Sequence, residues 1–111
     1  MAYDELLVVR IRAALSDQPG LKEQKMFGGV CFMLNGNMAC GVHKTDLIVR
    51  VGLEKHAQSL SRPHARVFDL TGRPMTGWVS VSSPGFATEQ DLKLWLRLGV
   101  DFVNTLPPKR K

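Results

Sequence analysis

MFGGVCFMLNGNMACGV, residues 26–42, decides the fold of this chain. Two apolar runs in this stretch flank the dipeptide Asn35-Gly36. Asn-Gly between two such runs is a strong β-hairpin signal, because both residues adopt the positive φ angles that a tight two-residue turn requires. We therefore expect residues 30–34 and 37–43 to form two antiparallel strands.

The motif Met26, Phe27, Gly28 and Gly29 stands immediately before the first of these strands. A phosphate-binding loop needs a defined glycine spacing and a helix N-terminus after it, whereas a strand-like run follows here. We interpret the motif as structural, a bend or bulge that joins or interrupts the strand-like residues 22–27 and 30–34. The alternative is a small ligand-binding or catalytic pocket beside the two glycines, lined by convergent polar groups.

The two cysteines, Cys31 and Cys40, lie on the two strands of the hairpin. A two-residue turn at Asn35-Gly36 places them opposite each other, close enough for a cross-strand disulfide. A three-residue turn with Gly36 in a bulge shifts the register and separates them. In both cases we treat the thiols as small buried apolar groups. Because Cys40 and His43 have no second ligand pair beside them, we predict neither a metal site nor a cofactor.

Further helices and strands are expected on both sides of the hairpin. Periodicity and the positions of Pro and Gly predict helices over residues 3–16, 53–61 and 89–106, and strands over residues 47–51, 66–70 and 77–82. The order α-β-β-β-α-β-β-α is typical of a two-layer α+β domain. We expect an antiparallel sheet with the helices packed mainly on one face, a single domain over residues 1–106 and a basic tail over residues 107–111.

Two of these helices have features that an ordinary amphipathic helix lacks. Val8 and Val9 make the first helix apolar over more than one face, so we expect it to be deeply buried or covered by a partner. Gly99 lies within the apolar stripe of the last helix, where glycine costs about 1 kcal/mol relative to alanine. A glycine at this position would let that helix pack closely on the sheet, because it has no side chain.

One strand predicts a candidate partner surface. Alternation within residues 77–82 puts Val79 and Val81 on one face and Trp78 on the other. If the helices cover the valine face, Trp78 points to the opposite face together with Ile48 and Arg50. An apolar patch on an open sheet face marks a protein partner or a second copy of the chain. The alternative is that a loop covers Trp78 locally.

The net charge of +5 raises the question of nucleic-acid binding. Three of the excess positive charges come from Lys109, Arg110 and Lys111, which leaves a mildly basic folded body. The candidate contacts to a phosphate backbone are these three residues together with Arg62, Arg66 and Arg73. The alternative is a solvated tail that only keeps the protein in solution.

Enzymatic activity is not predicted. The sequence contains no nucleophile elbow, no zinc-protease motif and no Walker pattern. The N-terminus carries acidic residues instead of the positive charge of a signal peptide, and no apolar run approaches the ~18 residues of a membrane span. Together with only two cysteines, this predicts a cytoplasmic protein.

Several segments together resemble the TfoX N-terminal domain family. They are Met26-Phe27-Gly28-Gly29, the Asn35-Gly36 turn, LIVRVG at residues 47–52, GRPMTGWV at residues 72–79, the helix start before Trp95, and TLPPK at residues 105–109. They occur in the family's order over nearly the whole chain. The resemblance implies the same α+β layering that periodicity predicts.

The resemblance also implies a role. Proteins of the TfoX and Sxy type regulate natural competence in bacteria and act with a cyclic-AMP-responsive transcription activator. They carry a second, helical C-terminal domain, so we expect this chain to be a stand-alone version of the N-terminal domain. The family brings no catalytic residues. The expected function is a non-enzymatic regulatory module that contacts a protein partner, such as a transcription regulator, or a second copy of itself.

Overall fold

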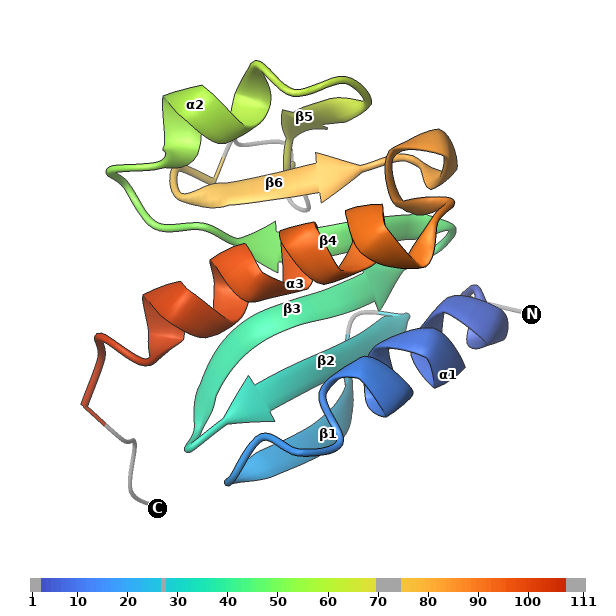
Figure 1. Cartoon of the computed structure of the whole chain (residues 1–111), viewed down its shortest axis with the longest axis vertical. Coiled ribbons are helices and arrows are strands. Elements are labelled where there is room, and N and C mark those ends of the chain that lie inside the picture. The colour runs from blue at the N-terminus through green and yellow to red at the C-terminus, as the bar shows by residue number, and fades with distance from the viewer. Residues whose placement is uncertain (1–2, 27, 70–74, 108–111) are drawn as a thin grey trace.

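A computed structural model of the protein describes residues 3–26, 28–69 and 75–107 (Figure 1). The elements are α1 (Glu5–Ala14), β1 (Leu21–Met26), β2 (Gly29–Leu34), β3 (Asn37–His43), β4 (Asp46–Arg50), α2 (His56–Leu60), β5 (Ala65–Val67), β6 (Trp78–Val81), the 3-10 helix η1 (Ser83–Phe86) and α3 (Glu89–Val103). Within the described residues, no helix is both long and apolar enough to cross a membrane.

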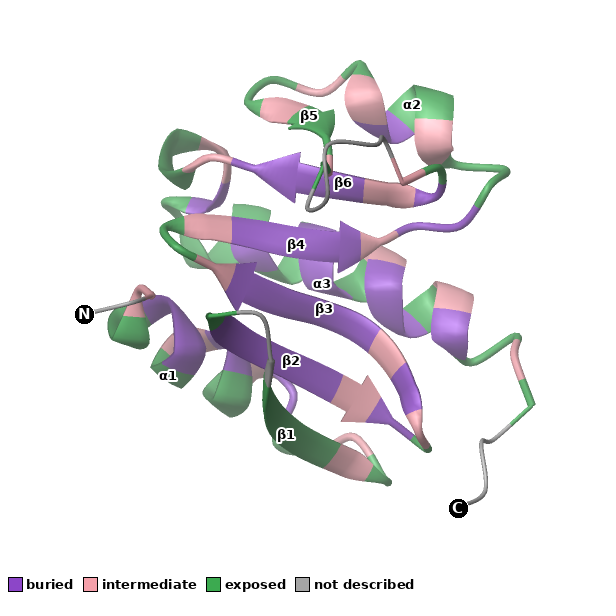
Figure 2. Ribbon diagram, turned by 180° about the vertical axis from the view of Figure 1, so that it is seen from behind, coloured by how far each residue is buried: buried purple, intermediate pink, exposed green. Residues whose placement is uncertain are grey.

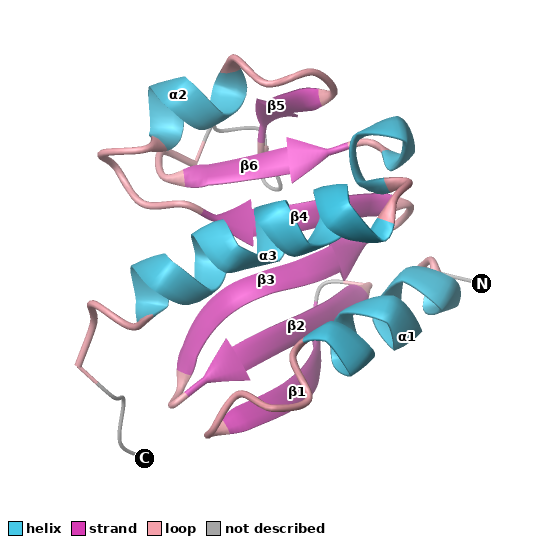
Figure 3. Cartoon of the chain, viewed as in Figure 1, coloured by secondary structure: helices cyan, strands magenta, loops and turns pink. Residues whose placement is uncertain are grey.

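The strands form one sheet in the order β1-β2-β3-β4-β6-β5, and every neighbouring pair is antiparallel. Helices α1 and α3 lie across one face of this sheet, and α3 packs mainly on β3 and β4 (Figure 3). We call this the helix face and the other side, seen in Figure 2, the open face. The α+β class, the alternation of helices and strands and the antiparallel sheet are confirmed.

The strand-like segment before the hairpin forms two strands. Met26 of β1 pairs with Gly29 of β2, and Gly28 between them has a φ of +75°. Such a positive φ is readily available only to glycine, so the chain reverses direction here where we expected a bend or bulge. The sheet of the described residues therefore has six strands, one more than the expected five.

The hairpin between β2 and β3 has a two-residue turn, the first of the two alternatives considered. Leu34 pairs with Asn37, and the turn residues Asn35 and Gly36 have φ angles of +52° and +85°. These angles are those of a tight turn that matches the twist of the strands. Further from the turn, however, the register shifts: Phe32 pairs with Cys40, which leaves Ala39 as an extra residue in a β-bulge.

The core lies between the sheet and the helices. Phe32, Leu47 and Val49 of the sheet are fully buried against Leu92 and Leu96 of α3. Helix α3 begins as predicted, with the Thr88 hydroxyl accepting a hydrogen bond from the Asp91 backbone N–H at 3.0 Å. Burial of apolar surface on this scale is the main stabilising term of such a domain.

Gly99 explains how α3 comes so close to the sheet. A Cβ atom at this position would collide with the carbonyl oxygen of Ala39 and would lie 3.2 Å from its carbonyl carbon. Ala39 is the bulged residue of β3. The predicted close packing at Gly99 is therefore confirmed, and the bulge is part of the same contact.

All three helices and the last two strands are shorter than expected. The second helix covers only His56–Leu60 of the predicted residues 53–61. The fifth strand covers Ala65–Val67, whereas residues 66–70 were expected. Phe68 leaves the strand and instead packs against side chains of the open face, so local β propensity is overridden by tertiary contact at this position.

Candidate functional site

The bulge separates the two cysteines. Cys40 pairs with Phe32 and faces the core, while Cys31 pairs with Gly41 and faces the open side of the sheet. Both thiols are free and buried. The turn has two residues, yet the expected opposition of Cys31 and Cys40 is wrong, because the extra residue Ala39 shifts the register between the turn and the cysteines.

Burial raises the pKa of both thiols, because a low-dielectric surrounding disfavours the thiolate. We expect Cys31 and Cys40 of the native protein to react with a thiol reagent at pH 8 at least tenfold more slowly than the same cysteines in guanidinium chloride. Ellman's reagent, followed at 412 nm in both conditions, measures this. Rapid native reaction of one thiol, or a mobility difference between reduced and oxidised protein on a gel, would contradict it.

The glycine motif has a structural explanation. Gly29 is buried, and a Cβ atom there would lie 3.0 Å from the carbonyl carbon of Val42 on β3. The lack of a side chain thus permits β2 and β3 to pair at this point. A cavity of about 180 Å³ lies near the motif, between α1 and β1. Two of its charged side chains, Arg12 and Glu23, bond to each other at 2.5 and 2.8 Å, and Lys25 is the third charged residue of its lining.

The candidate partner residues Trp78, Ile48 and Arg50 do lie on one face, the open face. Arg50 is the register partner of Trp78, and Ile48 is the partner of Ser80. Ile48 is only 2% exposed, so it offers almost no surface to another protein. Of the three residues, only Trp78 and Arg50 are accessible, and both are half-buried.

A local segment shields Trp78. The ring of Phe68 lies 6.4 Å from the Trp78 ring and 6.2 Å from the His43 ring, centroid to centroid. The Arg50 guanidinium stacks on Trp78 at 5.3 Å from the ring centroid. The alternative of local covering therefore accounts for much of the Trp78 surface, and the role of this face in partner binding stays a prediction.

The candidate nucleic-acid contacts do not converge where the structure describes them. Arg66 forms an ion pair with Asp46, to which Ser80 Oγ also donates at 3.4 Å. Arg62 lies over the ring of Trp95 at 5.5 Å from its centroid. Arg66 is thus held on the open face and Arg62 against α3. The remaining candidates lie outside the described residues: Arg73, Lys109, Arg110 and Lys111.

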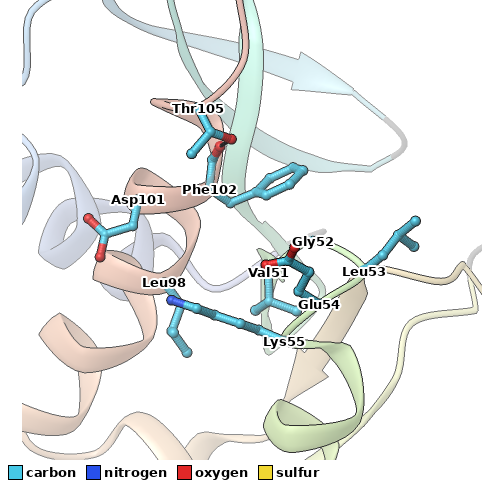
Figure 4. Close-up of a pocket in the computed structure, with 9 residues that line it drawn as sticks. All are labelled: Val51, Gly52, Leu53, Glu54, Lys55, Leu98, Asp101, Phe102 and Thr105. Carbon is cyan, nitrogen blue, oxygen red and sulfur yellow. Dashed lines mark hydrogen bonds between the residues drawn. The ribbon is translucent and has the colours of Figure 1, made fainter.

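The structure also has a groove that the sequence reasoning missed (Figure 4). It has a volume of about 540 Å³ and lies between the β4–α2 connection and the C-terminal half of α3. Its lining residues are Val51, Gly52, Leu53, Glu54, Lys55, Leu98, Asp101, Phe102 and Thr105. We call it the α3 groove.

Apolar side chains dominate the α3 groove. Val51, Leu98 and Phe102 line it, and Leu53 at its side is 71% exposed. The charged Glu54, Lys55 and Asp101 are exposed on its rim. Such a surface suits apolar side chains of another molecule. The sequence shows that Leu98 and Phe102 share one side of a helix, but it does not show that residues 51–55 lie opposite them.

The back of the groove is connected to the open face. The Arg50 guanidinium lies 5.2 Å from the centroid of the Phe102 ring and so contacts both Phe102 and Trp78. Arg50 therefore holds the ring that forms one wall of the groove. Trp78, a candidate partner residue from the sequence, thus contacts the α3 groove indirectly: its ring stacks on the Arg50 guanidinium, which in turn stacks on Phe102.

Comparison with known proteins agrees with the architecture. The family model described as the TfoX N-terminal domain matches residues 13–103 of the 111-residue chain, which includes every element from the end of α1 to the end of α3. A search of curated proteins found no match. The chain belongs to the TfoX N-terminal domain family.

Proposed function

We propose that this protein is a non-enzymatic cytoplasmic regulatory module that binds a protein partner through the α3 groove. The observation that carries the proposal is the groove itself, a solvent-accessible apolar surface beside an exposed leucine, Leu53. Membership in the TfoX N-terminal domain family supports a regulatory role connected with competence. The partner class we propose is a transcription regulator, and the cyclic-AMP-responsive activator is the first candidate.

The groove suits one amphipathic helix of a partner. Its apolar wall is formed by Leu98 and Phe102, which lie about one turn apart on one side of α3, and Thr105 follows just beyond the end of the helix. A helix laid in such a groove inserts apolar anchors at similar spacing, while charged rim residues fix its orientation. Glu54, Lys55 and Asp101 supply charges of both signs for that purpose. The buried Ile48 on the open face has no comparable accessibility.

The first test compares two exposed leucines. Leu53→Asp places a carboxylate at the groove, and we expect it to weaken partner binding at least tenfold, which corresponds to about 1.4 kcal/mol. Leu6→Asp is the matched control, because Leu6 on α1 is 70% exposed and Leu53 is 71% exposed. The purified cyclic-AMP-responsive activator, titrated by calorimetry or biolayer interferometry, gives the two affinities.

The outcome is decided by the difference between the two variants. Loss of binding by Leu53→Asp with binding retained by Leu6→Asp supports the groove. Equal affinity of Leu53→Asp and the natural protein would remove the groove from the proposal. A complete lack of binding by the natural protein would remove this activator as the partner.

A further inference from the structure

Helix α1 has an apolar stripe on the side that faces away from the core. Leu6 and Val9 are 70% and 52% exposed, and Ala13 continues the line as an exposed residue. On the opposite side of the same helix, Leu7 and Ile11 are buried against the sheet. Helix α1 is therefore apolar on more than one face, but the expected deep burial of the whole helix is wrong, because its second apolar face is open to solvent. Its cover by a partner stays a prediction.

The spacing of this stripe is that of a helix that packs on another helix. Leu6, Val9 and Ala13 follow each other by three and four residues, which is the a/d pattern of paired helices. In that pattern the buried residues Leu7, Val8 and Ile11 occupy the b, c and f positions, away from the a/d seam. One helix can therefore pack on its own sheet and on a second helix at the same time.

The charges beside the stripe are fixed by ion pairs. On one side, Arg12 bonds to Glu23 through Nε and Nη2, an interaction that also lowers the pKa of Glu23. On the other side, Arg10 bonds to Glu89 at 3.1 Å and to the backbone carbonyl of Phe86 at 2.9 Å. These bonds hold both arginines beside the seam, so the stripe itself stays uncovered.

We propose that α1 pairs with α1 of a second copy in an antiparallel, two-fold symmetric arrangement. With the axis between Leu6 and Val9, Leu6 of each copy packs on Val9 of the other, an a-to-d contact. This register places the g position Glu5 beside the g position Arg12 of the second copy, in both symmetric places. Arg12 keeps its bonds to Glu23, because Nη1 takes part in neither of them.

The charge pattern favours a second copy over an unrelated helix. When identical helices pair in antiparallel orientation, opposite charges on the two g positions that meet stabilise the pair. Glu5 of one copy and Arg12 of the other carry such opposite charges. The surface lies on the far side of α3 from α2, so the dimer leaves the α3 groove open (Figures 1 and 3). The proposal therefore does not depend on the proposed function.

The dimer is expected to be weak. Helix α1 has 10 residues and is about 15 Å long, so one pair of helices buries less than the ~1,200 Å² of a standard stable interface. We expect a dissociation constant on the order of 100 µM. Sedimentation equilibrium of the full chain from 5 µM to 1 mM should then show a concentration-dependent rise toward the dimer mass.

Two variants test the surface. Leu6→Glu should remain a monomer over this range, because it buries a charge in the seam. Val9→Gln should weaken the dimer at least threefold and is the milder second variant. Leu53→Asp at the α3 groove is the matched control and should dimerise as the natural protein does. A natural protein that stays monomeric at 1 mM, or a Leu6→Glu variant that dimerises normally, would overturn the proposal.

Cross-linking tests the register. An oxidised equimolar mixture of Leu6→Cys and Val9→Cys chains should give a mixed disulfide-linked dimer, because these positions meet across the axis. Ala13→Cys alone should not cross-link, since the two copies of residue 13 lie at opposite ends of an antiparallel pair. Efficient self-cross-linking of Ala13→Cys indicates a parallel pair and would contradict the arrangement. Loss of dimerisation by Leu53→Asp alone would place self-association in the groove instead.

Discussion

Replacement of Gly99 by alanine is expected to lower the free energy of unfolding by about 2–3 kcal/mol, although alanine is the better helix former. Helix propensity alone predicts the opposite sign, a stabilisation of about 1 kcal/mol. Packing decides the result, because the new methyl group would collide with the Ala39 carbonyl oxygen. That oxygen belongs to the backbone of a strand, so it cannot rotate away as a side chain would.

The rest of the molecule cannot easily adapt to the extra methyl group. To make room, α3 must move away from β3 and β4, and this separates Leu92 and Leu96 from the core. Protein interiors are packed as densely as organic crystals, so a shift of this kind loses many small contacts at once. We therefore expect Gly99→Val, with a larger side chain, to be more destabilising than Gly99→Ala.

Urea unfolding followed by tryptophan fluorescence and circular dichroism measures the effect, since Trp95 lies in the same helix. Arg97→Ala is the control, because it changes an exposed position of α3 and should alter the midpoint little. An increase in stability of Gly99→Ala would show that α3 does not rest on the Ala39 carbonyl.

The comparison between Gly99 and Ala39 shows what could be predicted from the sequence. A glycine inside an apolar helical stripe indicates a close approach, because nothing local explains it. The position that it approaches was not predictable, since it depends on a bulge at Ala39 and hence on packing between distant elements. For the same reason the hairpin at Asn35-Gly36 was predicted correctly, while the opposition of Cys31 and Cys40 that a two-residue turn implied was wrong.

For the candidate surfaces, too, local features could be predicted and contacts between distant segments could not. Alternation along a strand correctly put Trp78, Ile48 and Arg50 on one face, because a strand has a period of two whatever its surroundings. It did not show that Phe68 folds over Trp78. The α3 groove arises where a loop meets a helix some 50 residues away, so no pattern within either segment indicates it.

The second large effect is expected at the groove itself. Replacement of Gly52 by alanine should lower the free energy of unfolding by about 3 kcal/mol and should also weaken partner binding. Gly52 has a φ of +85°, which costs a residue with a side chain about 1–2 kcal/mol. Its new Cβ would also lie 2.6 Å from Cε1 of Phe102, a groove residue.

The Phe102 ring has little freedom to avoid this contact. The Arg50 guanidinium contacts the ring at 5.2 Å, and Arg50 is itself held by Trp78 on the open face. The Gly52 backbone is fixed as well, because the N–H groups of Val51 and Gly52 donate to the Gly77 carbonyl at 2.8 and 3.0 Å. The substitution therefore displaces the Phe102 ring and changes the shape of the α3 groove.

Gly77→Ala is a matched control that separates the two causes. Gly77 also has a positive φ, +91°, but the nearest atoms to its added Cβ lie at 3.5–3.7 Å, an ordinary contact distance. Gly77→Ala should therefore show the backbone strain alone, and Gly52→Ala should be more destabilising by about 1–2 kcal/mol. Urea midpoints give both values. An equal decrease in the free energy of unfolding for the two variants would mean that the Phe102 ring moves aside freely. The partner affinity of Gly52→Ala would then equal that of the natural protein.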